Sequence, residues 1–364
     1  MTTDTTAIAA RDRQITYRTT LTGLLLAGVL VVGACSSSTE KTGAASSGPR
    51  RVPTTATGAP GHTPGPSASP GCTAPVLVQP GASDHTITSG GVERVYQLVV
   101  PGSYDGRKPY PIVLALHALT VTYKVIASMT GFGDMAPKYD FIGVAPSGRV
   151  DGSTPYWMAA PTADNYDVAF IGQLLDELEA TLCIDTSRVF STGMSNGAQM
   201  SSLLACRMSD RITAIAPVSG EEFLEPCNGR PVPILAFHGT SDPILPYRGG
   251  GLNATQIANS HFWKSKIPAG MPKPLGVDES MRLWARHNHC GSSYVEERVA
   301  PEVRKRTWKG CAADTTLYII DGGGHAWPGK PVPQFEQSFG HGTTEIDATD
   351  LMFKFFFDAP RLRR

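Results

Sequence analysis

The stretch 188–200 constrains the fold of this chain more than any other part of the sequence. A β-favouring run over 189–192 leads into Gly193-Met-Ser195-Asn-Gly197, and apolar residues at helical spacing follow. The central serine of such a tight turn is expected to have φ > 0, which costs energy for a residue with a side chain. Glycines on either side let the chain reverse and let the strand and helix lie close together.

This strand–turn–helix arrangement is the nucleophile elbow, in which a serine hydroxyl stands at the N-terminus of a helix. There the helix dipole and the free N–H groups favour developing negative charge. Gly-x-Ser-x-Gly alone is a weak pattern in a chain with 38 glycines, and an ordinary glycine-rich turn is the alternative. Its position between a strand pattern and a helix pattern favours the elbow, so we predict that Ser195 is a nucleophile.

The first 34 residues have the features of an export signal. Three arginines precede an apolar run over 21–32, and small residues follow it. The run is shorter than a typical transmembrane helix, although a retained anchor is an alternative. Residues 32–35, Val-Gly-Ala-Cys, also resemble the lipobox of bacterial lipoproteins, in which the cysteine is lipidated. We therefore predict a signal peptide over 1–34 and lipidation of Cys35, with an ordinary secreted protein as the alternative.

Residues 35–71 are dominated by Ser, Thr, Gly, Ala and Pro, and they lack the large apolar side chains that a core needs. Such a segment is predicted to be a disordered tether between the anchor and a globular domain over 72–364. Lysine plus arginine and aspartate plus glutamate both number 32, so no excess of basic charge indicates nucleic-acid binding. We expect a monomer that lies outside the cytoplasm and is held to the membrane by its lipid.

Six cysteines remain in the predicted domain if Cys35 carries lipid, and an even number in an exported protein fits disulfide bonds. We favour two short local loops and one bond that pins the start of the domain. The predicted pairs are Cys72–Cys183, Cys206–Cys227 and Cys290–Cys311. A metal site is the weaker alternative, because no close group of cysteine and histidine has ligand-like spacing.

Strand and helix patterns alternate through the predicted domain. A Gly-Gly turn at 90–91 joins two runs of alternating apolar residues, as in a hairpin. Further strands are predicted at 110–117, 141–145, 215–219, 233–238 and 316–320. Helices are predicted from 168, from 200, from 278 and around 352–356, with Asp167 near the start of the first. The alternation implies the α/β class, with a mostly parallel central sheet and helices on both faces.

A nucleophilic serine needs a base, and the base needs an orienting carboxylate. Asp242 follows the predicted strand 233–238, and functional loops lie at the carboxyl ends of such strands. The alternative for Asp242 is a turn aspartate before Pro243. His325 follows three glycines directly after the last predicted strand, which favours it as the base; His341 is the rival.

Two N–H groups are also needed to stabilise a developing oxyanion. We predict that Asn196 supplies one and that Leu119, in the loop after an early strand, supplies the other. His117 and His238 end two predicted strands, and we interpret both as hydrogen-bonded structural histidines.

The chain resembles the α/β-hydrolase esterases of the polyhydroxybutyrate depolymerase and feruloyl esterase family, many of which are bacterial lipoproteins. The resemblance covers 72–358 and rests on Leu116-His117, Gly193–Gly197, His238–Pro243 and Gly322–Gly329. It implies an α/β-hydrolase fold, with Ser195, Asp242 and His325 as the catalytic triad and no metal or organic cofactor. The chain departs from the family at Ala118, where glycine is usual, and a methyl group there can tilt the loop that carries Leu119.

The combined prediction is a lipid-anchored serine esterase that hydrolyses small-molecule or polymer esters through an acyl-enzyme. Short-chain, hydroxyalkanoate, feruloyl and acetyl esters are the candidate substrates. An acyltransferase of the same fold and a non-catalytic binding lipoprotein are the alternatives. The segments 146–161 and 249–277 carry only scattered aromatic residues among Gly, Pro and polar ones, which favours an open cleft and hydrolysis over transfer. The 249–277 insertion forms either part of the substrate wall or a surface excursion.

Overall fold

The computed structural model describes residues 67–250 and 274–361, which belong to one compact unit. The predicted signal peptide, the lipidation site Cys35 and most of the 249–277 insertion lie outside the described residues. None of the described helices is long and apolar enough to cross a membrane.

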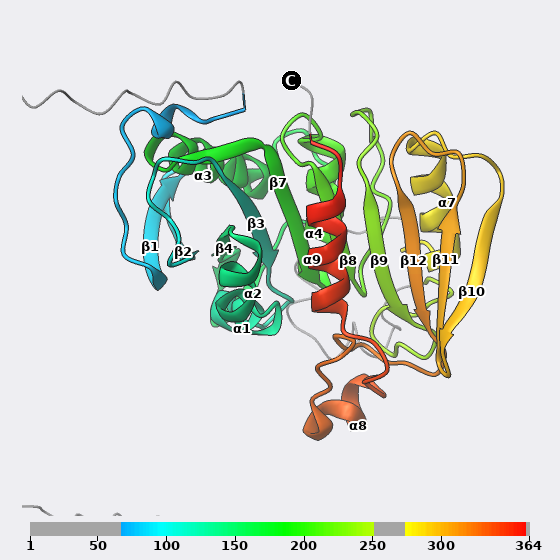
Figure 1. Ribbon diagram of the computed structural model, residues 1–364. Helices are drawn as coiled ribbons and strands as arrows, with labels where there is room; N and C mark the ends of the chain where they lie inside the picture. The colour runs from blue at the N-terminus through cyan, green and yellow to red at the C-terminus, as the bar shows by residue number, and fades with distance from the viewer. Residues whose placement is uncertain (1–66, 251–273, 362–364) are drawn as a thin grey trace, which may run out of the picture. The chain divides into compact units, whose positions relative to one another are not determined.

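A ten-stranded sheet forms the centre of the fold, in the order β1-β2-β4-β3-β7-β8-β9-β12-β11-β10 (Figure 1). Its strands are β1 Gly81–Ser89, β2 Val92–Val100, β3 Tyr110–Leu116, β4 Ile142–Pro146, β7 Ile184–Met194, β8 Ala214–Val218, β9 Ile234–Gly239, β10 Tyr294–Ala300, β11 Val303–Trp308 and β12 Thr315–Ile320. The neighbours from β4 to β12 pair in parallel, whereas the two outer strands on each side pair antiparallel. A separate small hairpin joins β5 Arg149–Asp151 and β6 Thr154–Tyr156.

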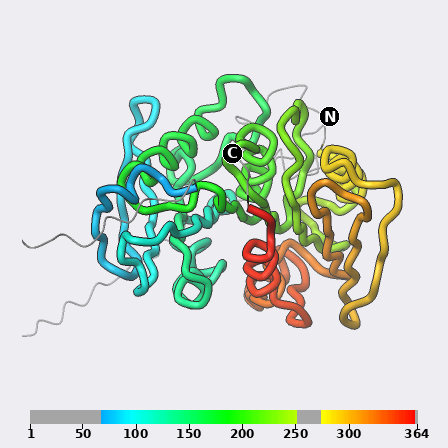
Figure 2. Tube along the Cα trace, turned by 45° about the horizontal axis from the view of Figure 1, so that its top comes forward, coloured from blue at the N-terminus to red at the C-terminus, as the bar shows by residue number. Residues whose placement is uncertain are grey.

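Helices cover both faces of this sheet, as the sequence predicted. The described helices are α1 Tyr123–Met129, α2 Phe132–Tyr139, α3 Tyr166–Thr181, α4 Asn196–Arg207, α7 Val277–His287, α8 Glu336–Phe339 and α9 Ala348–Asp358, with short 3-10 helices η1 Pro70–Cys72 and η2 Pro333–Phe335. Apolar residues of α3, α4 and α7 share one core cluster, and those of α1, α2 and α9 share the other. In both views α9 crosses the middle of the sheet, where it contacts β8 and β9 (Figures 1 and 2).

The strand β3 shows why the buried strands read as continuous apolar runs. Ile112 and Leu114 belong to one core cluster, whereas Val113 and Ala115 belong to the other, and all four side chains are buried. A strand buried on both faces has no polar face, so its sequence does not alternate. The predicted strands at 110–117 and elsewhere in the centre of the sheet are confirmed on this basis.

Two outer strands, β10 and β11, were not predicted. Their exposed positions carry charged residues that pair across the hairpin, with Arg304 Nη1 2.8 Å from Glu296 Oε1 and Lys305 Nζ 3.3 Å from Glu297 Oε1. Because polar side chains occupy both faces for much of their length, these strands lack the apolar alternation that marks a half-buried strand. Helix α3 also differs in detail, since its N-cap is Asn165, which accepts from the amides of Asp167 and Val168.

The three predicted disulfides are confirmed, with Cα–Cα distances of 4.0 Å for Cys72–Cys183, 4.6 Å for Cys206–Cys227 and 3.7 Å for Cys290–Cys311. The folded part begins before Cys72, however, within residues that we assigned to the tether. The Ser69 hydroxyl donates to the carbonyl of Leu182 at 2.7 Å and accepts from the amide of Ile184 at 2.9 Å. Small polar residues here complete the buried backbone hydrogen bonds at the start of β7, which composition alone does not reveal.

Candidate active site

Ser195 lies at the turn between β7 and α4, as predicted, with φ 57° and ψ −121°. Its amide donates to the carbonyl of Val218 at 3.0 Å, which fixes the turn against β8. A Cβ added at Gly193 would lie 2.6 Å from the backbone of Gly197, and one added at Gly197 would collide with the carbonyl of Leu116. The two glycines are therefore required by the close approach of strand, helix and β3, and the strained turn is the expected elbow.

Asp242 and His325 come from the loops after the neighbouring parallel strands β9 and β12, and their side chains meet. His325 Nδ1 donates to Asp242 Oδ2 at 2.7 Å, and both side chains are buried. Asp242 Oδ1 accepts from the amides of Ile244 and Leu245, each at 2.8 Å. Burial opposes ionisation of Asp242, but the hydrogen bond and charge of His325 hold the pKa of the carboxyl below its usual value. With Nδ1 protonated toward Asp242, His325 Nε2 is left as a hydrogen-bond acceptor.

The glycines before His325 allow the loop after β12 to pack closely against its neighbours. A Cβ at Gly239 would collide with the backbone of Gly323, and one at Gly324 would collide with the carbonyl of Phe339. The amide of His325 donates to that same carbonyl at 2.6 Å. The loop after β12 is thus pressed between the end of β9 and the segment that follows α8, and this fixes the direction of the imidazole.

His341, the rival base, does not contact Asp242. Its Nε2 lies 3.1 Å from Glu302 Oε2, and its side chain is 49% exposed. Of the two candidate bases, only His325 is oriented by a buried carboxylate, which agrees with our choice between them.

The loop after β3 is held by a network that the sequence did not predict. The side-chain amide of Asn196 binds both backbone groups of Trp157, accepting from its N–H at 2.7 Å and donating to its carbonyl at 3.1 Å. Trp157 Nε1 in turn donates to the carbonyl of His117 at 3.1 Å. His117 Nε2 accepts from the amide of Gly148 at 2.8 Å, and burial lowers the pKa of His117 to about 4, so the ring is neutral. The expectation of a structural histidine is confirmed at this position.

The predicted donor Leu119 lies in this loop, where the neighbouring amides are already hydrogen-bonded. Thr120 has φ 67°, and its amide donates to the carbonyl of Pro155 at 3.1 Å, while the amide of Val121 donates to Ala118 at 3.1 Å. Within the described residues no acceptor lies within hydrogen-bond reach of the Leu119 amide.

A buried ion pair also holds the loops around His117 in place. Arg94 Nη2 lies 2.7 Å from Asp167 Oδ1 and 3.0 Å from the carbonyl of Ser147, while Asp167 Oδ2 accepts from the amide of Met158 at 2.8 Å. Both side chains are almost fully buried. The pair ties β2 and α3 to the loops that pack on His117, and no pattern in the sequence distinguishes these two residues from ordinary surface charges.

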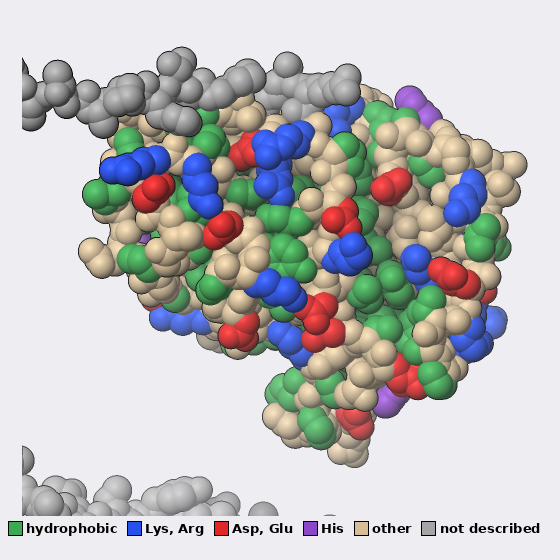
Figure 3. All heavy atoms as spheres, in the orientation of Figure 1, with side chains coloured by type: hydrophobic (Ala, Val, Ile, Leu, Met, Phe, Trp, Pro, Cys, Tyr) green, Lys and Arg blue, Asp and Glu red, His purple; other side chains and the backbone are tan. Residues whose placement is uncertain are grey.

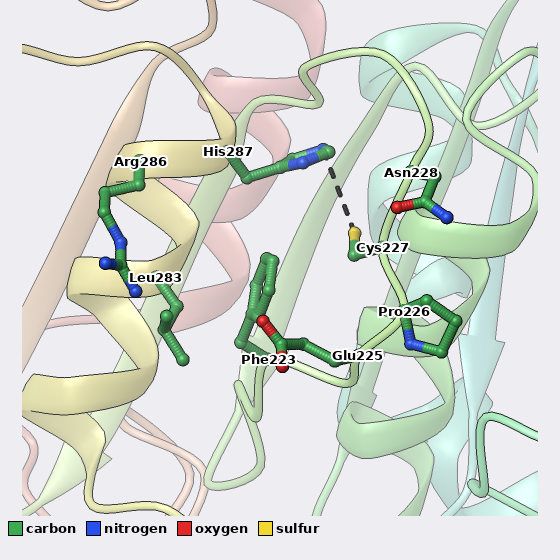
Figure 4. Close-up of a pocket in the computed structure, with 8 residues that line it drawn as sticks. All are labelled: Phe223, Glu225, Pro226, Cys227, Asn228, Leu283, Arg286 and His287. Carbon is green, nitrogen blue, oxygen red and sulfur yellow. Dashed lines mark hydrogen bonds between the residues drawn. The ribbon is translucent and has the colours of Figure 1, made fainter.

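A hollow in the described part of the chain lies apart from these residues. It has a volume of about 650 Å³ and lies between α7 and the segment 223–228, next to the Cys206–Cys227 disulfide (Figure 4). Phe223, Glu225, Arg286 and His287 are among the residues that line it (Figure 4). None of its lining residues belongs to the predicted site. Among the described residues, no three histidine, cysteine or acidic side chains are grouped as metal ligands.

No family model matches the chain, but individual relatives do. The Aspergillus niger protein named "Probable feruloyl esterase C" is 30% identical over 229 residues, which are 59% of this chain and 78% of that protein. Feruloyl esterase C of Emericella nidulans is 31% identical over 182 residues, which are 47% of this chain and 64% of that protein.

Among solved structures, an acetyl xylan esterase from Aspergillus awamori matches with a TM-score of 0.52 over 76% of this chain and 99% of that one. At 17% identity this match shows the fold alone, and it is the α/β-hydrolase fold that the strand order also indicates. The chain therefore belongs to the feruloyl esterase C family and is a carboxylic ester hydrolase of the α/β-hydrolase fold.

Proposed function

We propose that this esterase works through an acyl-enzyme on Ser195, with His325 as the general base and Asp242 as its orienting carboxylate. The observation that carries the proposal is the buried 2.7 Å hydrogen bond between His325 and Asp242. It lies at the carboxyl edge of the sheet that also carries the elbow, because β7, β9 and β12 all run in parallel. Functional groups collect at that edge in open α/β sheets.

In this mechanism His325 Nε2 takes the proton of the Ser195 hydroxyl as the oxygen attacks the ester carbonyl carbon. The carbonyl π bond opens to an oxyanion, which accepts hydrogen bonds from the amides of Asn196 and Leu119. The oxyanion then re-forms the carbonyl, the C–O bond to the alcohol breaks, and His325 returns its proton to the leaving oxygen. Water repeats the sequence on the acyl-enzyme and releases the free acid.

The donors of the oxyanion hole are supported by the groups that surround them. Asn196 opens α4, so its amide points out of the helix N-terminus, where the dipole favours an anion. Its side chain is hydrogen-bonded to the backbone of Trp157, and these bonds hold the loops on both sides of the oxyanion hole in place. Removing one such donor costs roughly a hundredfold or more in kcat.

For the substrate we propose an ester with a short or aromatic acyl group. The names of the relatives, feruloyl esterase and acetyl xylan esterase, motivate this class. An apolar surface also lies beside the base: the Phe339 ring centroid is 6.2 Å from that of His325, with the ring planes inclined by 30°, and Val332 and Phe335 are exposed on the same segment. This segment around α8 projects from the carboxyl edge of the sheet and carries a group of hydrophobic side chains (Figures 1 and 3).

We further propose that the enzyme is exported as a monomer and held to the membrane by lipid on Cys35. Three disulfides fit an oxidising compartment outside the cytoplasm. Cys35→Ser should abolish lipid attachment, because the lipid needs the thiol. Membrane fractionation and intact mass test this, and a variant that stays on membranes with the wild-type mass excludes the anchor.

The direct test of the catalytic proposal is a fluorophosphonate probe applied to the full chain, followed by peptide mapping. The probe should label Ser195 alone, and Ser195→Ala should remove both labelling and the hydrolysis of a chromogenic acetate. Labelling that persists in the variant would place the nucleophile elsewhere. A panel of acetyl, butyryl, hydroxybutyryl and feruloyl esters, with product analysis by mass spectrometry, then identifies the acyl group and separates hydrolysis from transfer.

A further inference from the structure

A second buried imidazole, that of His238, lies close to the Asp242 carboxylate. His238 is the next-to-last residue of β9, and it is 3% exposed. Its Nδ1 lies 2.9 Å from Glu221 Oε1 and 3.0 Å from Oε2. Its Nε2 lies 2.8 Å from the carbonyl of Leu245 and 3.4 Å from Asp242 Oδ2. Two imidazoles, those of His325 and His238, therefore approach the same oxygen of the Asp242 carboxylate.

The partners of His238 define its protonation state. Both ring nitrogens face oxygen acceptors that have no proton to offer, since a backbone carbonyl and two carboxylates surround the ring. Only the imidazolium can donate from both nitrogens. Burial alone disfavours that charge, but the charge and hydrogen bond of Glu221 outweigh it and raise the pKa of His238 to about 9.

Glu221 is itself buried, at 2% exposed, and is held in place from several sides. Its Oε2 accepts from the amide of Gly220 at 3.0 Å, and its carbonyl accepts from Trp284 Nε1 at 3.0 Å. Gly220 packs directly on the backbone of Ser195, where a Cβ would lie 2.5 Å from the Ser195 carbonyl. The pair thus bridges the elbow side of the site and the acid side.

We propose that Glu221 and His238 are positioning residues for ester hydrolysis, which hold a buried imidazolium against the Asp242 carboxylate and so fix its orientation and its charge. This inference rests on the proposed catalytic role of Asp242. Leu245 links the two functions, because its amide binds Asp242 and its carbonyl binds His238. The turn after β9 cannot rotate without breaking both hydrogen bonds.

The charged neighbours of His238 set the expected pH behaviour. The loop after β8 contributes Glu221 and Glu222, the loop after β9 contributes Asp242 and Tyr247, and the loop after β12 contributes His325 beyond Asp242. Glu222 is turned to Gln199, at 3.0 Å, and the Tyr247 hydroxyl binds Asp278 of α7, which also pairs with Arg306 of β11.

With Glu221 and His238 both charged, the positive end of the pair lies nearest Asp242. That charge disfavours a second positive charge at the oxygen that the two imidazoles share. Glu221→Gln removes the anion that keeps His238 charged, so the buried ring becomes neutral near pH 7. A positive charge beside Asp242 is then opposed less strongly, so we expect the acid limb of the activity profile to move to a higher pH.

The experiment compares kcat and KM of the full chain between pH 4 and 9 with an uncharged acetate substrate. For Glu221→Gln we expect kcat to fall about tenfold, KM to change less than about twofold, and the acid limb of kcat/KM to move upward by about half a unit to one unit. Glu302→Gln is the matched control, since it breaks the exposed pair with His341, and its profile should overlay the wild type.

Nitrogen-15 spectra of histidine-labelled protein provide a readout independent of turnover. His238 should keep the imidazolium shifts up to about pH 8 in the wild type and in Ser195→Ala. A His238 signal that titrates near its ordinary value of about 6.5, or an unchanged acid limb in Glu221→Gln, overturns the proposal. If the wild type is not labelled at Ser195 by the fluorophosphonate probe, while the His238 signal and the acid limb behave as expected, the catalytic assignment is overturned instead.

Folding is controlled by a second variant. Glu221→Gln with His238→Gln removes both charges together and leaves no unpaired buried ion, so it should fold even if the single variant does not. It should show the same upward shift of the acid limb. A folded double variant with the wild-type profile contradicts the proposal.

Discussion

Two histidine–carboxylate pairs lie on loops near the same edge of the sheet, and they differ chiefly in burial. The side chains of His325 and Asp242 are 5% and 0% exposed and meet at 2.7 Å. Those of His341 and Glu302 are 49% and 28% exposed and meet at 3.1 Å. An exposed pair gains little because water screens it, whereas a buried one fixes geometry and protonation. Residue type alone does not separate the two.

Alanine substitution at each histidine should give the largest contrast. His325→Ala should lower kcat by roughly 10⁴-fold, because the acyl-transfer step loses its base. His341→Ala should leave kcat within about twofold, since this ring pairs with the surface carboxylates of Glu302 and Glu336. Steady-state kinetics on a chromogenic acetate measures both. A large loss in the second variant together with a small one in the first would reverse our choice of base.

The buried His238–Glu221 pair extends the comparison to stability. The pKa of His238 is raised from 6.5 to about 9, so the stabilisation is fully present below pH 6.5 and is lost as the pH rises through about 9. The shift corresponds to about 3 kcal/mol of unfolding free energy. Urea titrations at pH 6 and pH 9.5 should show the wild type losing more stability than Glu221→Gln by about that amount.

Equal pH dependence in the two proteins would mean that His238 gains nothing from Glu221. Disulfides should be kept intact in both titrations, since reduction would change the unfolded state as well as the folded one.

The exposed aromatic residues beside His325 allow a test of whether the substrate binds to the surface outside the buried pair. Phe335→Ala should raise KM for a feruloyl or phenyl ester about fivefold, by removing apolar contact area, with little change for methyl acetate. Leu77→Ala is the control, because the apolar residue Leu77 is 74% exposed and lies on the segment before β1. Equal KM changes for both esters, or an equal effect of the control, would exclude α8 from the binding surface.

The smallest effect is expected from the exposed pair itself. His341→Gln should change the unfolding free energy by less than about 0.5 kcal/mol at pH 6, because surface ion pairs contribute little. Chemical unfolding with the wild type alongside measures this. A loss of several kcal/mol would show that exposure is not what distinguishes the two pairs.

The difference between exposed and buried side chains also explains which parts of the site could be predicted from the sequence. Ser195, Asp242 and His325 each follow a strong strand pattern, and two carry glycine signatures, so local sequence was enough to nominate them. Glu221 follows β8 without any motif, and Arg94 occupies a strand position that reads as solvent-facing. Their functions depend on burial and on partners distant in the sequence, such as His238 and Asp167.

By itself the sequence determined the alternation of strands and helices, the elbow and the two local disulfides Cys206–Cys227 and Cys290–Cys311, because each depends on short-range patterns, steric limits of glycine or local loop closure. Only the tertiary structure decided the charged outer hairpin β10–β11, the hydrogen bonds between Asn196 and Trp157, and the approach of two imidazoles to one oxygen of Asp242. The physical reason is that a side chain's charge and hydrogen bonds are set by its burial and by its neighbours in space. Parallel strands bring together residues that are far apart along the chain.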